Sequence, residues 1–217
     1  MIFTLDYVEH ATLRDGTPVV LRLLAPEDKE LLRRGFERLS PESRYARFFV
    51  PKQRLTDEEL RYLCEIDQQR HFAIGAIRED GDGAGNPIGL GIGRFVRLPD
   101  EPGQPSTAEA AVAVIDEVQH QGLGRLLLLR LVAAAAERGI ERFRCHLLCS
   151  NSGMKALIDT LAPAQTIEIG SGVMSIDFAL PAADDPSSPL YRFFREAARG
   201  ALLPLRDGRD AQPRDGG

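Results

Sequence analysis

The sequence has no long hydrophobic run, few cysteines and no excess of positive charge. Its longest apolar stretch, Leu126 to Ala136, contains Arg130 and is much shorter than the roughly 20 residues that a membrane-spanning helix needs. The first ten residues carry Asp6 and Glu9 and have no apolar centre, so we expect no signal peptide. These absences predict a protein that has no membrane partner.

Cysteine is scarce, with only Cys64, Cys145 and Cys149 in 217 residues. Their spacing matches no metal-binding pattern, and any single pairing leaves one thiol over. We therefore expect no metal site and no structural disulfide framework. Free thiols are typical of the reducing cytoplasm, which is the expected location.

Acidic residues outnumber basic ones, 32 against 27, which gives a net charge of −5 and an isoelectric point near 5.5. This balance argues against nucleic acid as a partner and mildly favours a cationic one. Hydrophobic residues make up 43% and charged residues 27% of the chain, as in ordinary globular proteins. The length suits one domain followed by a tail.

Strand and helix patterns alternate along most of the chain. The runs typical of strands are 19–23, 72–77, 88–96, 108–114, 142–148, 166–169 and 173–180. Helices are predicted over 26–39, after the N-caps Ser40 and Thr56, over 126–138, and from Asn151 to Pro163. Three alternating glycines in 89–93 are followed by no helix, so they indicate a bulge or a close backbone approach instead of a dinucleotide loop.

The stretch from Gln119 to Arg125 combines two glycines with the start of a predicted helix. The first turn of a helix presents unpaired N–H groups at the positive end of its dipole, and phosphate is the usual ligand there. Gly122 and Gly124 lack side chains, so a diphosphate can approach the main chain closely. An ordinary strand-to-helix turn has the same pattern, because short glycine motifs occur often by chance.

Gln119-x-x-Gly122-x-Gly124 after an apolar strand resembles the pyrophosphate loop of the GNAT N-acetyltransferase superfamily. Within that superfamily, the chain resembles the acetyltransferase domain of the bacterial protein-lysine acetyltransferases called Pat. The segments that carry this second resemblance are 39–49, 56–64 and 66–73.

The resemblance implies an α/β (α+β) GNAT fold over residues 1–180. Its central sheet should be mixed, mostly antiparallel and of six or seven strands, with helices on both faces. It also implies acetyl-CoA as the acetyl donor, whose pantetheine arm would pair with a strand. The implied donor-binding residues are Val112, Ala113, Val114, Gln119, His120, Gln121, Gly122, Leu123, Gly124, Arg125 and Asn151. Two of these have ordinary alternatives, Arg125 as a solvated side chain and Asn151 as a helix cap.

Acetyl transfer to an amine requires a neutral nucleophile. A free lysine amine has a pKa near 10.4, so about one in 2,500 is neutral at pH 7, and supplying the neutral form costs about 4.6 kcal/mol. A general base is therefore expected. Glu109 is the candidate, because it stands where the Pat family carries its catalytic glutamate, and strand alternation places it on one face with Ala111 and Ala113. The alternative is a strand-end glutamate that faces solvent.

The acceptor favoured by the resemblance is a protein lysine. A small amine, such as a polyamine or amino sugar, is the rival, and a catalytically weak acetyl-CoA-binding module is the alternative outside enzymes. Many GNAT enzymes use a tyrosine after the Asn151 position as general acid, but Leu157, Ile158 and Leu161 occupy that helix here. This helix then offers no side chain that would protonate the leaving thiolate. The thiolate leaves without such a group, or a water protonates it.

Two further segments have open interpretations. Arginines gather before and within the short helices, and they indicate a solvated face or, alternatively, a surface that steers an acidic group. They are Arg33, Arg34, Arg38, Arg44, Arg47 and Arg54. The tail, 181–217, begins as a linker, carries a predicted amphipathic helix over 189–203 and is expected to end in disorder. That helix either packs on its own domain or docks on a partner subunit, as in a homodimer.

Overall fold

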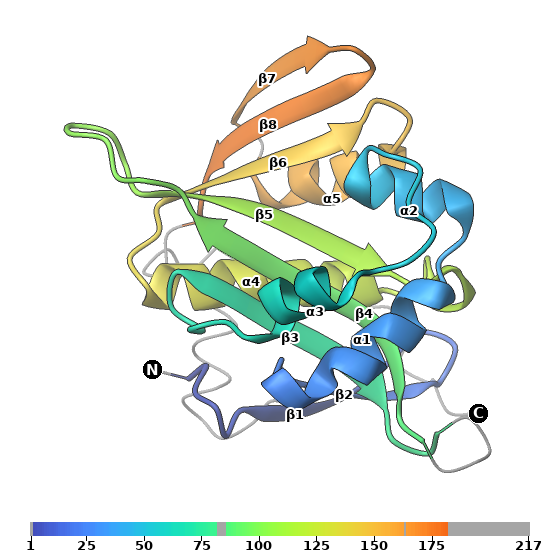
Figure 1. Cartoon of the computed structure of the whole chain (residues 1–217). Helices are drawn as coiled ribbons and strands as arrows, with labels where there is room; N and C mark the ends of the chain where they lie inside the picture. The colour runs from blue at the N-terminus through green and yellow to red at the C-terminus, as the bar shows by residue number, and fades with distance from the viewer. Residues whose placement is uncertain (1, 82–85, 163, 182–217) are drawn as a thin grey trace, which may run out of the picture.

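A computed structural model of the chain describes residues 2–81, 86–162 and 164–181. These residues form one eight-stranded sheet in the order β1-β2-β3-β4-β5-β6-β8-β7, flanked by helices (Figure 1). The elements are β1 (Val8–Thr12), β2 (Pro18–Leu23), η1 (Pro26–Asp28), α1 (Lys29–Glu37), α2 (Pro41–Phe48), α3 (Asp57–Cys64), β3 (His71–Arg78), β4 (Ile88–Arg97), β5 (Thr107–Val114), η2 (Asp116–Val118), α4 (Leu123–Glu137), β6 (Arg142–Leu148), α5 (Ser152–Leu161), β7 (Gln165–Gly170) and β8 (Val173–Ala179).

The sheet is mixed and mostly antiparallel, as the resemblance implied. Only the β5–β6 pairing is parallel among the strand pairs of the described chain. The structure adds one strand to the seven that the sequence indicated, the edge strand β1, which pairs with β2. Its pattern was missed because Glu9, its second residue, is buried although a glutamate is typical of a surface position.

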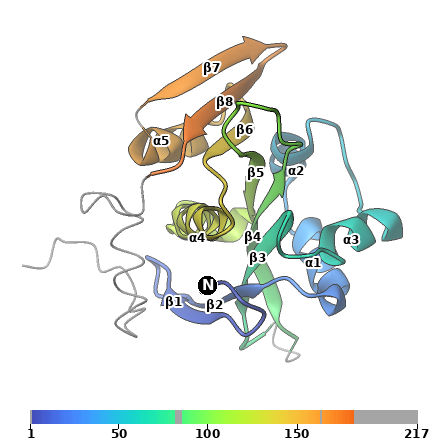
Figure 2. The ribbon, with the colours of Figure 1, turned by 90° about the vertical axis from the view of Figure 1, so that its left-hand side faces the viewer.

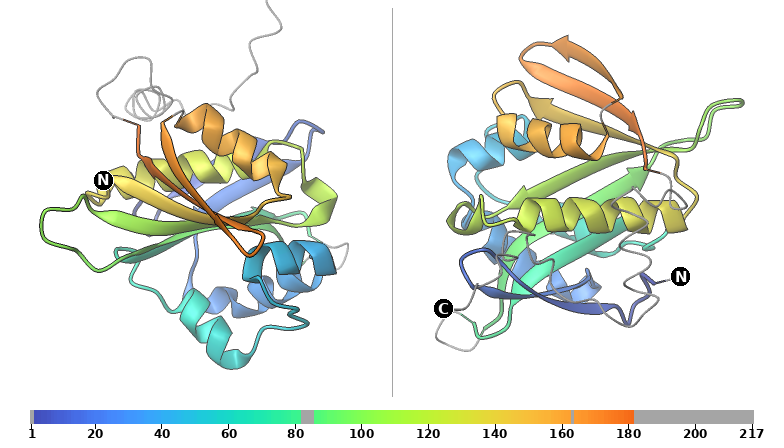
Figure 3. Two further views of the ribbon diagram at one scale, coloured as in Figure 1. Left: turned by 90° about the horizontal axis from the view of Figure 1, so that it is seen from above. Right: turned by 180° about the vertical axis from the view of Figure 1, so that it is seen from behind.

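Helices cover both faces of the sheet. Figure 2 shows α1, α2 and α3 on one side, and α4 and α5 on the other, and α4 runs along its face when the molecule is seen from behind (Figure 3, right). The longest of them, α4, is apolar almost all round and largely buried, as its sequence predicted.

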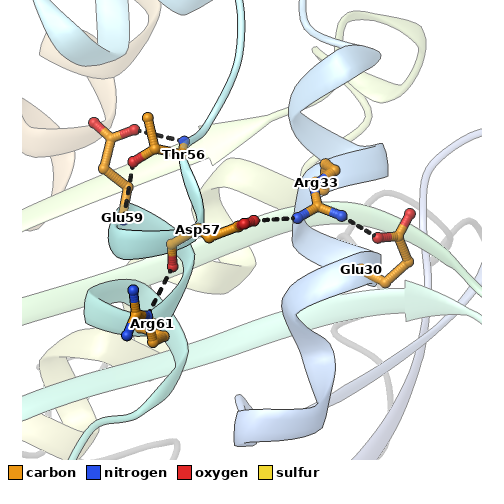
Figure 4. Close-up of polar contacts among 6 residues, drawn as sticks. All are labelled: Glu30, Arg33, Thr56, Asp57, Glu59 and Arg61. Atoms are coloured by element: carbon orange, nitrogen blue, oxygen red, sulfur yellow. Dashed lines mark hydrogen bonds and ion pairs between the residues drawn. The ribbon is translucent and has the colours of Figure 1, made fainter.

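The short helices begin where local capping chemistry predicts. The Ser40 hydroxyl accepts from the N–H of Ser43 at 3.1 Å, with Pro41 in the first turn of α2. Thr56 and Glu59 form a reciprocal capping box at α3, with distances of 2.8 and 3.2 Å (Figure 4). Because these signals lie within four residues of one another, the sequence alone was enough to predict them.

The glycines of β4 have the two roles that the sequence indicated. The β3–β4 register shifts between Ala76 and Ile77, opposite Gly91 and Gly89, so a bulge lies there. A Cβ on Gly91 would lie 3.0 Å from the carbonyl oxygen of Ala113. A Cβ on Gly93 would lie 3.0 Å from Leu131 of α4. The bare strand therefore lets α4 approach the sheet closely.

The parallel strands β5 and β6 separate after a short paired segment. Their register pairs end at Glu109 with Arg144, although β5 stays paired with β4 as far as Val114. In Figure 1 the two ribbons lie side by side at their N-terminal ends and diverge toward their C-terminal ends. The sheet is thus split along one seam, and the helix α2 contacts both strands there.

Some predictions concern residues outside the described part of the chain. The amphipathic helix expected over 189–203, the disordered end and the homodimer that the tail would serve all fall within 182–217, so they stay predictions. The domain boundary at residue 180 likewise stays a prediction. Among the described helices, none is long and apolar enough to cross a membrane.

Candidate active site

A groove with a volume of about 820 Å³ occupies the split between β5 and β6. Its walls come from β5, the 119–125 loop, the helix α2 and the start of α5. The N–H of Ile115 donates to the carbonyl oxygen of Leu90, so the main-chain groups of Ile115 face β4. Successive residues of a strand direct their N–H and C=O groups to alternate sides. The N–H and C=O of Val112, three residues earlier, therefore face the β6 side, where the groove lies. An extended, amide-containing arm can therefore pair with β5 where β6 does not.

The loop between β5 and α4 presents its main-chain N–H groups to one end of the groove. His120 and Gly122 both have positive φ, 60° and 92°, and Gly122 is the N-cap of α4. The first bond of the helix is from Leu126 to Gly122. Within the described chain, no protein acceptor receives a hydrogen bond from the N–H groups of 122–125. This is the geometry that binds a diphosphate at a helix N-terminus.

Gln119 acts as an anchor for this loop. Its Nε2 donates to the carbonyl oxygen of Val114 and to the hydroxyl of Ser43, both at 3.1 Å. The loop is thereby tied to the end of β5 and to α2. Ser43 in turn donates to Asp116 at 2.8 Å, and Asp116 also bonds Ser40. These bonds fix the loop before any ligand binds.

Asn151 is both a helix cap and a wall of the groove. Its Oδ1 accepts from the N–H of Met154 at 3.1 Å, as the cap of α5. Its Nδ2 makes no hydrogen bond to the described protein, and the residue lines the groove. The two interpretations of Asn151 are therefore compatible, since one side-chain atom serves the helix and the other is available to a ligand.

The remaining predicted donor residues divide into two groups. Those that line the groove are Val112, Ala113, Val114, His120, Gly122, Gly124 and Arg125. Gln121 and Leu123 do not line it: the carbonyl oxygen of Gln121 accepts from Arg14 at 3.1 Å, and Leu123 is fully buried in the core. These two residues therefore take part only through the path of the main chain.

Glu109 lies where two cavities meet. It lines a small cavity of about 50 Å³ that shares Val112 and Asn151 with the groove, and a second cavity of about 340 Å³ on the α1–α3 side of the sheet. We call the second one the acceptor cavity. The carboxylate is exposed and faces this space together with Ala111, as strand alternation predicted.

Two arginines stand beside Glu109: Arg47, which belongs to the group of arginines that the sequence indicated, and Arg94, which the sequence did not single out. Arg47 of α2 lines the groove, the small cavity and the acceptor cavity. Arg94 of β4 lines the acceptor cavity and is 6% exposed. A sequence signal existed for Arg94, since it is a charge in the middle of an apolar strand. Among the described residues, no cluster of three or more histidines, cysteines or acids that would hold a metal is found.

A mixed sheet that opens between two parallel strands, with a helix N-terminus at the opening, is the architecture of a class of acyl-group transferases. Residues 34–160, more than half of the chain, match the acetyltransferase (GNAT) family, and the chain belongs to that family. Enzymes of this family are acetyltransferases that use acetyl-CoA.

Two curated proteins and one solved structure show which members of the family this chain is similar to. The acetyltransferase Pat of Mycolicibacterium smegmatis is 32% identical over 192 residues, which cover 88% of this chain and 55% of that protein. An acetyltransferase of Pseudomonas aeruginosa is 31% identical over 147 residues, covering 67% and 75% respectively. The crystal structure of the GNAT domain of S. lividans PAT superposes with a TM-score of 0.68 at 28% identity, covering 80% of this chain and 97% of that domain. The chain spans about half the length of the mycobacterial relative.

Proposed function

We propose that this acetyltransferase transfers the acetyl group of acetyl-CoA to the side-chain amine of a protein lysine, by direct attack, with Glu109 as general base. The observation that carries the proposal is the position of Glu109, which lines both the acceptor cavity and the small cavity beside the groove. The lysine acceptor is the one that the resemblance to the protein-lysine acetyltransferases called Pat implies, and relatives with the name Pat are among the similar proteins.

The donor is held by main-chain groups. The edge of β5 at Val112 pairs with the pantetheine arm, and the N–H groups at 122–125 bind the diphosphate. Arg125 and the Nδ2 of Asn151, which both line the groove, add side-chain donors. This placement brings the thioester to the small cavity, next to Glu109.

The acceptor amine enters from the other side of the sheet. Glu109 takes its proton, directly or through one water, which supplies the neutral nucleophile. The nitrogen attacks the thioester carbonyl, the carbon–sulfur bond breaks, and CoA leaves as a thiolate that solvent protonates. The groove-facing residues of α5, which are Gly153, Met154 and Leu157, carry no acid for this step.

Glu109→Gln tests the proposal. Thiol release from acetyl-CoA in the presence of lysine-containing protein or peptide should fall by about 10²–10⁴-fold, because the general base is lost. Acetyl-CoA binding measured by calorimetry should be unchanged. Glu168→Gln is the matched control, since Glu168 is exposed on β7 and lines neither the groove nor the acceptor cavity. Equal activity of the two variants would remove Glu109 from the mechanism.

Two alternatives have their own signatures in this assay. Turnover with polyamines or amino sugars, but with no protein or peptide, assigns a small-amine acetyltransferase. Acetyl-CoA binding without thiol release toward any acceptor assigns a binding module. The acceptor cavity of about 340 Å³ accommodates either a small amine or the end of a lysine side chain.

A further inference from the structure

The acceptor cavity contains a buried positive charge that no carboxylate of the described residues neutralises through an ion pair. Arg94 lies in the middle of β4, and its guanidinium donates to the carbonyl oxygen of Leu63 at 2.9 Å and contacts Nε2 of His71 at 3.2 Å. Within the described chain it has no carboxylate partner. Buried charges in proteins are normally paired, so this arrangement is costly unless a ligand completes it.

His71 holds this guanidinium as a neutral acceptor. Burial, together with the positive charge of Arg94, lowers the pKa of His71 to about 4. The imidazole is therefore uncharged at neutral pH, and Nε2 accepts a hydrogen bond because an arginine only donates. Burial and the neighbouring charge of Arg47 also lower the pKa of Arg94 to about 10, which leaves it charged at pH 7. The site is positive and rigid.

Arg47 adds a second positive charge to the same space. It is half-buried, and within the described residues it forms no ion pair. Two other arginines of the group are compensated: Arg33 of α1 pairs with Glu30 and Asp57 at 2.6 and 2.8 Å (Figure 4), and Arg38, which follows α1, pairs with Glu117. The solvated-face interpretation therefore fits these two arginines and fails for Arg47.

The charges that line the acceptor cavity do not balance. Two guanidiniums, Arg47 and Arg94, face one uncompensated carboxylate, Glu109, because Glu59 is already paired with Lys52. One positive charge is left over. A ligand that brings only an amine would add to this surplus, whereas a ligand with a carboxylate would remove it.

The strand register places Arg94 and Glu109 on the same face of the sheet. Arg94 lies opposite Ala111, and Glu109 lies opposite Val96, so Arg94 and Glu109 are diagonal neighbours on one face. Diagonal neighbours in an antiparallel pair have Cα atoms about 7–8 Å apart. An amine at Glu109 and an anion at Arg94 would therefore lie over the same face of the sheet, on neighbouring strands.

We propose that the acceptor carries a carboxylate close to its reacting amine, that Arg94 and Arg47 bind this carboxylate, and that the pair of arginines selects acceptors. This inference rests on the proposed acetyl transfer and specifies its substrate class. An amine with a carboxylate close by is found in a free amino acid and in a lysine next to an acidic residue of a protein. Binding such an anion aligns the amine with Glu109 and neutralises the buried surplus.

Paired acceptors that differ only in the carboxylate test this proposal. One arm compares free amino acids with their amides, and the other compares lysine peptides flanked by Glu with the same peptides flanked by Gln. We expect kcat/KM for thiol release to be at least about tenfold higher for the acidic member in the arm that contains the natural acceptor. The arm that responds identifies the source of the carboxylate.

Arg94→Gln is the matching variant. It should raise KM for the acidic acceptor about tenfold or more while changing kcat little, and it should abolish the preference over the neutral acceptor. Arg47→Gln should act in the same direction. The control is Arg33→Gln, which removes a charge from the same layer of helices but outside the cavity. Unchanged acetyl-CoA affinity and an unchanged melting temperature show that a variant is folded.

The outcomes separate this inference from the function on which it rests. Thiol release that is equal for acidic and neutral acceptors overturns the inference and leaves the acetyltransferase proposal intact. A preference that survives Arg94→Gln also overturns it, because another group would then select the carboxylate. Failure of every acceptor in both arms contradicts the proposed function itself.

Discussion

Arg130 and Arg94 are both buried, but within the part of the chain that the structure describes only Arg130 has a carboxylate partner. Arg130 donates to the two carboxylate oxygens of Glu9 at 2.7 and 2.5 Å, and the hydroxyl of Tyr7 donates to the same carboxylate. Burial and the charge of Glu9 raise the pKa of Tyr7, so the phenol stays protonated. The Glu9 cluster is complete within the protein and is therefore structural, in contrast to the acceptor cavity.

Glu9→Gln should lower the free energy of unfolding by about 3–5 kcal/mol, because Arg130 loses the carboxylate that faces it in the interior. The double variant Glu9→Leu with Arg130→Met should lose much less, since no buried charge is left behind. Urea denaturation of the three proteins measures both effects. Equal losses in the single and double variants would contradict the account of the pair as a unit.

At this scale, the sequence predicted residues whose role depends on near neighbours in the chain. The caps Ser40 and Thr56 are examples, and Asn151 is a cap as one of its two interpretations stated. Glu9 was missed because its partner lies 121 residues away on α4. Arg47 belonged to a group with two interpretations, a solvated face and a surface that steers an acidic group. The sequence could not choose between them, since the position of Arg47 between cavities arises only when α2 docks on the sheet.

Among the elements, the turn into α4 has the strictest conformational demand. Gly122 has a φ of 92°, a conformation that costs a residue with a Cβ about 1–2 kcal/mol. Gly124 has no such demand, and a Cβ there would meet Leu157 at 3.8 Å and Val114 at 4.0 Å, which are ordinary contacts. The two glycines of the motif therefore differ in what they require.

Gly122→Ala should weaken acetyl-CoA binding by about tenfold, because a strain of roughly 1–2 kcal/mol displaces the N–H groups that face the diphosphate. Gly124→Ala should bind acetyl-CoA nearly as well as the unchanged protein and should gain up to about 1 kcal/mol in stability from its helical position. Calorimetric titration with acetyl-CoA compares the two variants. Loss of binding in Gly124→Ala alone would place the closest approach of the diphosphate at Gly124 instead of Gly122.

Most elements could be predicted because their periodicity and stop signals are local. β1 could not, since its alternation is hidden by a buried ion pair. The eight-stranded order and the split after Glu109 could not be derived from periodicity either, because strand pairing joins residues far apart in the chain. The resemblance supplied a sheet of this kind, and the register then explained why Val112 is available to a ligand.

In the whole molecule, the split makes the sheet incomplete without a ligand. Acetyl-CoA at 100 times its dissociation constant should stabilise the protein by about 2.7 kcal/mol. This corresponds to a rise of about 5–10 °C in the melting temperature of a domain of this size. Thermal unfolding with and without acetyl-CoA measures the rise, and Gly122→Ala should show a smaller one at the same concentration. If acetyl-CoA left the melting temperature of an active preparation unchanged, binding in the groove would be contradicted.

The meeting of cavities at Glu109 is a property of the whole fold. The sequence placed Glu109 on the correct face of its strand, and the resemblance proposed its role. Neither specified the acceptor cavity, because its walls come from α2, α3, β4 and β5 together. The charge surplus at Arg47 and Arg94 appears only in that assembled wall.

The missing rungs between β5 and β6 also bear on inhibitor design. The edge of β5 at Val112 has no partner strand on the β6 side. An extended peptide-like ligand, with amides spaced about 3.3 Å per residue, would supply the hydrogen-bond donors and acceptors that are missing there. Such a ligand could end in a sulfonate or carboxylate directed at the start of α4. It would then make both contacts proposed for the coenzyme, with β5 and with the helix N-terminus, without carrying a nucleotide. Such compounds would compete with acetyl-CoA for the groove between β5 and β6, and they would not have to enter the acceptor cavity.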